Sequence, residues 1–166
     1  MKDFLEHGLK RDLGQFEKPF GRVLELGPGN TPWKGITDSL DFPSWNGEEG
    51  YIPFDSFTFH QIWAIHFLEH IENVIPLLRD CQRVLLDGGV MNIVVPYYTS
   101  NLHHSDLDHK HTFTEDTWKT LLFNEYYDKD HSDWTMKINF NMIYGVAERN
   151  LCIATQLEKV PQDGKS

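Results

Sequence analysis

The sequence predicts a single α/β domain whose sheet is mainly parallel and ends in an antiparallel pair of strands. Three observations lead to this prediction. The chain has 166 residues, the length of one compact domain, and 40% of them are hydrophobic. Between 22 and 96, apolar runs of strand length alternate with a segment of helical periodicity. Near the end, two strand-like segments follow each other with no helix between them.

The first predicted strand covers 22–26 and ends at the turn-forming residues 27–30. The stretch 31–41 contains Pro32, Gly35 and β-suited residues but no apolar stripe at helical spacing. The connection after the first strand is therefore predicted to be shortened and to lack a full helix. Residues 59–65 form the next apolar run of strand length.

An amphipathic helix is predicted from Pro76, a suitable first-turn residue, to the Asp-Gly-Gly stop at 87–89. Residues 90–96 are apolar nearly throughout, which is typical of a central strand covered on both faces. A second helix is expected to start at 114–116. The segments 134–144 and 151–157 read as an antiparallel hairpin joined at 145–150.

The domain is predicted to span 21–160, after a polar lead-in segment (1–20) and before a flexible tail (161–166). With 15 Lys and Arg against 25 Asp and Glu, the net charge is −10, so nucleic acid is an unlikely partner. No apolar run approaches the roughly 18 residues of a spanning helix, and acids occupy the start, where a signal peptide needs apolar residues. Cys81 and Cys152 read as buried thiols. We therefore expect a cytoplasmic protein without a membrane partner.

A candidate ligand loop, Glu25-Leu26-Gly27-Pro28-Gly29, lies at the carboxyl end of the first strand, where open α/β sheets bind ligands. Two glycines permit close approach of a ligand, although a lone GxG is equally typical of an ordinary turn. The fingerprint GxGxxG is absent because position 32 is Pro, which disfavours nicotinamide or flavin binding. Asp41, about a dozen residues further on, is either a solvated turn residue or a ribose-binding acid.

Together these motifs resemble the class I S-adenosylmethionine-dependent methyltransferases, in particular their compact type 11 group. The resemblance covers about residues 20 to 120 and is carried by the order and spacing of six segments: 23–30, 35–41, 52–57, 64–71, 83–89 and 106–109. It implies a Rossmann-like fold and S-adenosyl-L-methionine as cofactor. The implied activity is methyl transfer to a small-molecule, sugar-like or side-chain acceptor.

The resemblance also implies a set of cofactor-binding residues at the ends of the strands: Glu25, Gly27, Pro28, Gly29, Asp41, Glu48, Ile65 and His66. The glycine loop would pass under the methionine part of the cofactor, while Glu25 holds the loop or the amino group. Asp41 would bind the ribose. Glu48, with Glu49 as a competitor, would meet the adenine amine, and residues 65–66 would line the methionine side.

Residues 102–111 hold four histidines and two aspartates. A metal site, a solvated loop and the lining of a substrate pocket are the three interpretations of this segment. Its spacing matches no metal motif, so no metal ligand is predicted. The resembled family has an Asp-x-x-His here, which implies that Asp106 and His109 are catalytic, with His109 as a proton acceptor titrating near neutrality. Glu69 and His70 match the family's LEH ending, where a supporting role is as good an interpretation as catalysis.

The short connection at 31–41 departs from the family and predicts an open adenosine side. A partner subunit or a second copy of the chain is one way to complete such a pocket. Two other function classes stay open at this point. One is a non-catalytic module that keeps the fold and binds a cofactor or partner, and the other is a metal-dependent hydrolase built on the histidine-rich segment.

Overall fold

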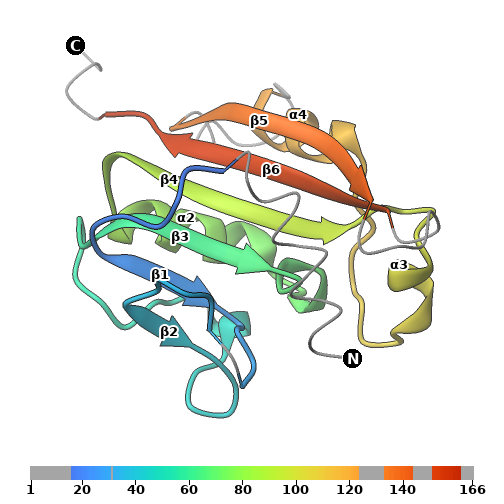
Figure 1. Cartoon of the computed structure of the whole chain (residues 1–166), viewed down its shortest axis with the longest axis horizontal. Helices are drawn as coiled ribbons and strands as arrows, with labels where there is room; N and C mark the ends of the chain where they lie inside the picture. Colours follow the sequence, from blue (N-terminus) through green and yellow to red (C-terminus); the bar gives the residue numbers. More distant parts are fainter. Residues whose placement is uncertain (1–15, 31, 124–132, 144–150, 162–166) are drawn as a thin grey trace.

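The computed structural model describes residues 16–30, 32–123, 133–143 and 151–161. Its centre is a six-stranded sheet in the order β2-β1-β3-β4-β6-β5 (Figure 1). The strands are β1 (Val23–Leu26), β2 (Asp38–Leu40), β3 (Phe59–Ile65), β4 (Leu85–Pro96), β5 (Trp134–Ile143) and β6 (Leu151–Lys159). The first four pair in parallel, and β6 runs antiparallel to both β4 and β5. The predicted sheet and its terminal antiparallel pair are confirmed.

Three α-helices and two 3₁₀ turns are described: α2 (Val74–Val84), α3 (Asn101–Ser105), α4 (Glu115–Phe123), η2 (Gly47–Glu49) and η3 (Leu68–His70). Pro76 falls in the first turn of α2, where a missing N–H breaks no helical hydrogen bond. The prediction that this helix reaches 87–89 is wrong. Leu85 already pairs with Phe59 of β3, so a sheet ladder replaces the helix directly after Val84.

The connection between β1 and β2 is short, as predicted. None of the described residues within 27–37 is helical. Instead, hydrogen bonds fasten the connection to the strands it joins: the Thr37 N–H donates to the Val23 carbonyl at 3.0 Å, and the Gly27 N–H donates to the Leu40 carbonyl at 2.8 Å. The sheet therefore begins with a three-residue strand held against β1, and the described part of the connection between them contains no helix.

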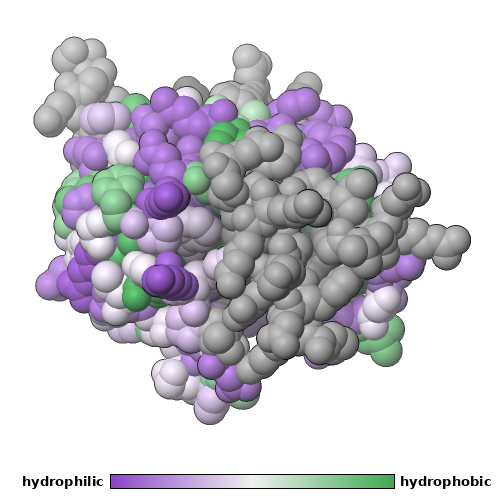
Figure 2. Space-filling model, in the orientation of Figure 1, coloured by the Kyte–Doolittle hydropathy of each residue, from purple (hydrophilic) through white to green (hydrophobic). Residues whose placement is uncertain are grey.

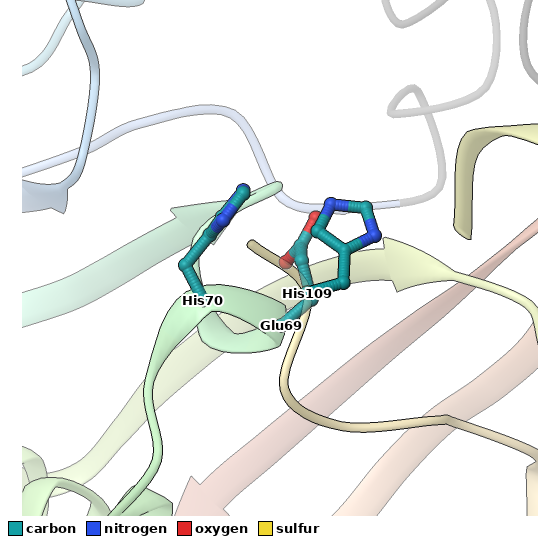
Figure 3. Close-up of side chains that lie close together, drawn as sticks. All are labelled: Glu69, His70 and His109. Atoms are coloured by element: carbon teal, nitrogen blue, oxygen red, sulfur yellow. The ribbon is translucent and has the colours of Figure 1, made fainter. Parts of the chain in front are cut away.

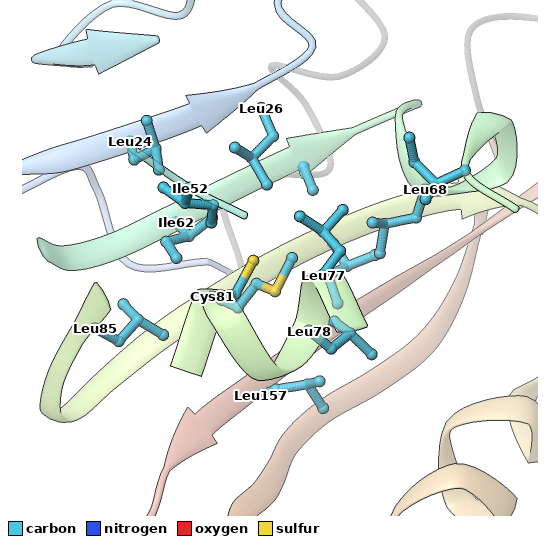
Figure 4. Close-up of a cluster of buried hydrophobic side chains, with 14 of the residues drawn as sticks. Leu24, Leu26, Ile52, Ile62, Leu68, Leu77, Leu78, Cys81, Leu85 and Leu157 are labelled. Carbon is cyan, nitrogen blue, oxygen red and sulfur yellow. The ribbon is translucent and has the colours of Figure 1, made fainter. Parts of the chain in front are cut away.

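The core has two layers, one on each face of the sheet. On one face, α2 packs against β4 and α4 packs against β5, and both helices share one core cluster with residues of β1 and β3. Figure 4 shows the α2 side chains meeting those of the strands. The other face carries a smaller cluster that includes Phe16, Trp63, Val94 and Cys152. Residues 90–96 are buried throughout, which confirms a strand covered on both sides. Cys81 and Cys152 are buried free thiols, as predicted.

Described side chains at the surface are mostly polar, and Figure 2 shows hydrophilic residues with scattered apolar ones on the visible face. Within the described residues, no helix is long and apolar enough to cross a membrane.

Candidate functional site

The parallel strands end together at one edge of the sheet, where their arrowheads point in Figure 1. Leu26 of β1 pairs with Leu40 of β2 and with Ala64 of β3. The chain leaves β1 towards β2 on one side, while β3 lies on the other side. Ligands bind at such a switch point in open α/β sheets. The register thus brings Gly27, Asp41 and residues 65–66 to one edge.

The two glycines of the loop differ in their surroundings. Gly27 has φ +66°, and a Cβ there would lie 2.3 Å from the Phe67 ring, so a neighbouring side chain already explains the need for glycine. Gly29 has φ +62°, and a Cβ there would meet nothing within 4 Å. The sequence assigned both glycines to the cofactor, and the structure leaves open space beside Gly29 only.

Glu25 is a buried acid beneath this loop. Its side chain points to the second face of the sheet, where Oε2 accepts a 2.9 Å hydrogen bond from the backbone N–H of Trp33. The residue is 2% exposed. Burial raises the pKa of Glu25 to about 7, against the opposing Trp33 hydrogen bond and with help from the charge of Asp41. Glu25 therefore holds the loop and is partly protonated near neutral pH.

Asp41 follows β2 and is half-buried. Its Oδ1 accepts the backbone N–H of Phe42 at 2.9 Å, which orients the carboxylate. The Phe42 ring beside it is 77% exposed. The sequence analysis did not single out this ring, although an aromatic residue directly after a candidate ribose-binding acid was a usable signal.

Glu48 already has partners in the described structure. Its carboxylate accepts the backbone N–H of Glu72 at 2.9 Å and of Asn73 at 3.3 Å, and it pairs with Lys110 at 3.5 Å. Burial opposes ionisation, but these donors together lower the pKa of Glu48. The side chain thus ties η2 to the start of α2, and a contact with an adenine amine would compete with these bonds.

Ile65 is the last residue of β3 and His66 follows it directly, as the sequence indicates. Ile65 is 9% exposed and belongs to the core. His66 has φ +52°, a strained backbone for a residue with a Cβ, and its N–H donates to the Val94 carbonyl at 2.8 Å. Its Nδ1 lies 3.1 Å from Glu69 Oε1 and its Nε2 lies 3.9 Å from Cys152 Sγ. His66 therefore links the strand edge to the segment that follows.

The histidine-rich segment folds back onto η3. Two of its histidines lie in α3, and the Lys110 N–H donates to the Glu69 carbonyl at 2.7 Å. The His109 side chain is 7% exposed, with Nδ1 3.0 Å from the His103 carbonyl and Nε2 3.9 Å from Asp106 Oδ2. Asp106 and His109 are neighbours, then, but at a separation beyond a hydrogen bond.

A cavity of about 590 Å³ lies between the start of α2, residues 111–114 and α4. Its size suits a small molecule. Its lining includes Glu72, His111 and Trp118, and none of the sequence-predicted site residues. The cavity and the strand edge are therefore separate features of the molecule.

No protein-family model matches the chain, and no curated protein matches it. Solved structures do. A putative methyltransferase in complex with the Haloferax volcanii Trm112 methyltransferase activator is 12% identical, with a TM-score of 0.70 over 98% of this chain and 92% of that one. An S-adenosylmethionine-dependent methyltransferase from Archaeoglobus fulgidus is 17% identical, with a TM-score of 0.67 over 96% and 95% of the two chains.

A third structure is Haemonchus contortus phosphoethanolamine N-methyltransferase 1 in complex with phosphoethanolamine and S-adenosylhomocysteine. It is 15% identical with a TM-score of 0.66, and the match covers 99% of this chain and 44% of that one. These likenesses extend over nearly the whole sequence, so they describe the complete sheet rather than a shared motif. The chain therefore has the Rossmann-like fold of the class I S-adenosylmethionine-dependent methyltransferases.

Proposed function

We propose that the chain binds S-adenosyl-L-methionine at the carboxyl edge of β1, β2 and β3 and transfers its methyl group to an acceptor. The observation that carries this proposal is the pair of acids at the ends of β1 and β2, Glu25 and Asp41, which lie close enough for the charge of Asp41 to raise the pKa of Glu25. The cofactor is cationic at its sulfonium and ammonium groups. The charge of Asp41, together with the partly ionised Glu25, favours such a ligand.

The chain's own residues fit the parts of this cofactor. Asp41, held by the Phe42 N–H, accepts hydrogen bonds from the two ribose hydroxyls. The exposed Phe42 ring offers an aromatic face to the adenine. The backbone of Gly29 and the polar edge of His66 border the methionine part, while Glu25 fixes the loop from below.

The cofactor supplies an activated methyl group, so the protein's task is chiefly to position an acceptor in line with it. His109 is the proposed catalytic residue, with Asp106 as its neighbour. Because Nδ1 faces the His103 carbonyl, which only accepts, Nε2 carries the lone pair that takes a proton from an acceptor hydroxyl or amine. The acceptor is proposed to be a small molecule or a side chain.

A second candidate function is a cofactor- or partner-binding module without turnover. It is favoured by the connection after β1: none of the residues described within 27–37 is helical, which leaves the adenosine side less covered. Fold does not by itself fix a reaction. The two functions differ in whether a product forms.

Calorimetric titration with S-adenosyl-L-methionine tests both. We expect binding by the wild-type chain and a loss of 1.5–3 kcal/mol in Asp41→Ala, about the scale of a charged hydrogen bond, or roughly 10- to 150-fold in Kd. Asp55→Ala removes an exposed aspartate elsewhere and serves as the matched control. Production of S-adenosylhomocysteine with a panel of acceptors supports the enzyme, and binding without product supports the module. No binding by folded wild-type protein would refute both methyl transfer and a cofactor-binding module.

A further inference from the structure

Beside the proposed cofactor site lies a cluster of three side chains with ligand atoms for a metal ion. Glu69 and His70 belong to η3, and His109 comes from the histidine-rich segment. One carboxylate oxygen and one nitrogen of each imidazole lie within 4.8 Å of one another. Figure 3 shows the carboxylate of Glu69 next to His109, with His70 facing them. The sequence separates His109 from the other two, and the fold brings them together.

The carboxylate of Glu69 is unusual because half of its hydrogen-bonding capacity is unused. The side chain is 1% exposed. Oε1 lies 3.1 Å from His66 Nδ1, whereas Oε2 is buried and has no hydrogen-bond partner among the described residues. A buried acceptor without a partner costs free energy that a bound cation would recover. Glu69 is thus fixed through one oxygen and available through the other.

His109 is arranged as a metal ligand. Its Nδ1 lies 3.0 Å from the His103 carbonyl oxygen, which accepts but does not donate, so we assign the ring proton to Nδ1. Metal-bound histidines typically donate their second nitrogen to a carbonyl or carboxylate in this way. Nε2 then has a free lone pair, and Oδ2 of Asp106 lies 3.9 Å from it.

The third ligand is presented next to His109. The His70 ring lies 4.7 Å from the His109 ring, at 70°, edge to face. The backbone is held in place on both sides, because the His70 N–H donates to the Phe67 carbonyl at 3.1 Å and the Lys110 N–H donates to the Glu69 carbonyl at 2.7 Å. The cluster therefore rests on a fixed backbone and not on mobile surface side chains.

We propose that Glu69, His70 and His109 bind a divalent transition-metal ion, with Zn²⁺ as the best match. Two imidazoles and one carboxylate are the ligands of zinc sites that keep one position open, whereas Mg²⁺ prefers oxygen ligands. Bonds of about 2.0–2.2 Å place tetrahedral ligands about 3.4 Å apart, so the three side chains close in on the ion. The sequence analysis predicted no metal ligand because it compared spacings within one segment.

Metal binding itself does not depend on the proposed cofactor. Its consequence for catalysis rests on the proposed function: an acceptor hydroxyl at the open position would lose its proton more easily. The ion would then take over the task assigned to His109, since Nε2 has one lone pair for either a proton or the metal.

The test uses the full chain without a histidine tag. Zn²⁺ affinity is measured by competition with a chromophoric chelator, and Co²⁺ substitution reports coordination through its visible absorption. We expect one equivalent on the wild type. In Glu69→Gln and His109→Ala, affinity should fall by more than the roughly 10- to 100-fold that loss of an outer partner costs. His104→Ala removes an exposed histidine of the same segment and should bind like the wild type.

The proposal is overturned if the wild type takes up no stoichiometric Zn²⁺, or if His104→Ala weakens binding as much as His109→Ala. Circular dichroism shows whether the variants fold. Should they unfold, the wild-type Co²⁺ spectrum decides, because intense bands of a four- or five-coordinate site support the cluster and weak octahedral bands contradict it. If the chain bound Zn²⁺ but not S-adenosyl-L-methionine, the proposed methyl transfer would be refuted and the metal site would stand.

Discussion

At the scale of single residues, the carboxyl edge of the sheet combines packing and ligand binding at adjacent positions. Gly27 leaves room for the Phe67 ring, which also stacks on Trp45 with 5.9 Å between ring centroids. Gly29, two residues later, has no neighbour at its missing Cβ. A substitution at position 27 therefore tests packing against Phe67. If such a variant lost cofactor binding, the loss would not show that Gly27 contacts the cofactor. Asp41 and Phe42 are better probes, because Asp41 is only half-buried and Phe42 is 77% exposed.

Glu25 gives a prediction about pH. Burial raises its pKa from 4.5 to about 7, so the folded chain holds this proton more tightly than the unfolded chain does. The free energy of unfolding should therefore fall as pH rises through this window, by on the order of 3 kcal/mol, and then level off. Glu25→Gln keeps an acceptor for the Trp33 N–H and lacks the titration. Urea denaturation between about pH 5 and pH 8 measures the difference, and parallel curves for the two proteins would contradict the prediction.

At the scale of elements, the connections of the sheet depend on particular anchors. Arg83 of α2 donates to the Ile52 and Phe54 carbonyls at 2.8 and 2.9 Å and so fastens the segment before β3 to the helix. Trp118 anchors α4 in the core. It is fully buried and stacks on Phe113 with 5.6 Å between ring centroids. Local helix propensity contributes little to a helix of nine residues, so burial of Trp118 in the core cluster holds α4 in place.

Trp118→Ala should therefore destabilise the domain strongly. Removal of a buried tryptophan costs about 3–5 kcal/mol through lost burial and the cavity left behind. Thr120→Ala, at an exposed position of the same helix, should change the free energy of unfolding by less than about 0.5 kcal/mol. Chemical denaturation compares the two variants. If Trp118→Ala lowered the free energy of unfolding by no more than Thr120→Ala, α4 would not depend on this anchor.

At the scale of the whole molecule, the proposed cofactor site joins three strands through segments distant in sequence. A ligand that binds only the folded chain stabilises the whole domain by mass action. At one hundred times its Kd, S-adenosyl-L-methionine should add about 2.7 kcal/mol, which raises the Tm by roughly 5–10 °C for a domain of this size. Thermal melting checks this. An unchanged Tm in the wild type, or an equal rise in Asp41→Ala at the same concentration, would argue against the site.

Much of the fold was predictable because local patterns of apolar residues in the sequence indicate it. The apolar run of residues 90–96, the hydrophobic spacing of α2 and the paired strands near the end report burial directly. The end of α2 was not predictable, because Leu85 joins the sheet through its pairing with Phe59, a partner far away in the chain. Local stop signals at 87–89 could not reveal that competition.

The sequence by itself determined the fold class, the loop after β1 and the acids beside it, since strand ends and turn residues are local signals. Only the tertiary structure decided where side chains point. It turned Glu48 towards the start of α2, filled the space over Gly27 with Phe67, and brought His109 to Glu69 and His70. The physical reason is that long-range packing and hydrogen bonds set the direction of side chains in loops. The spacing of residues along the chain does not reveal these contacts.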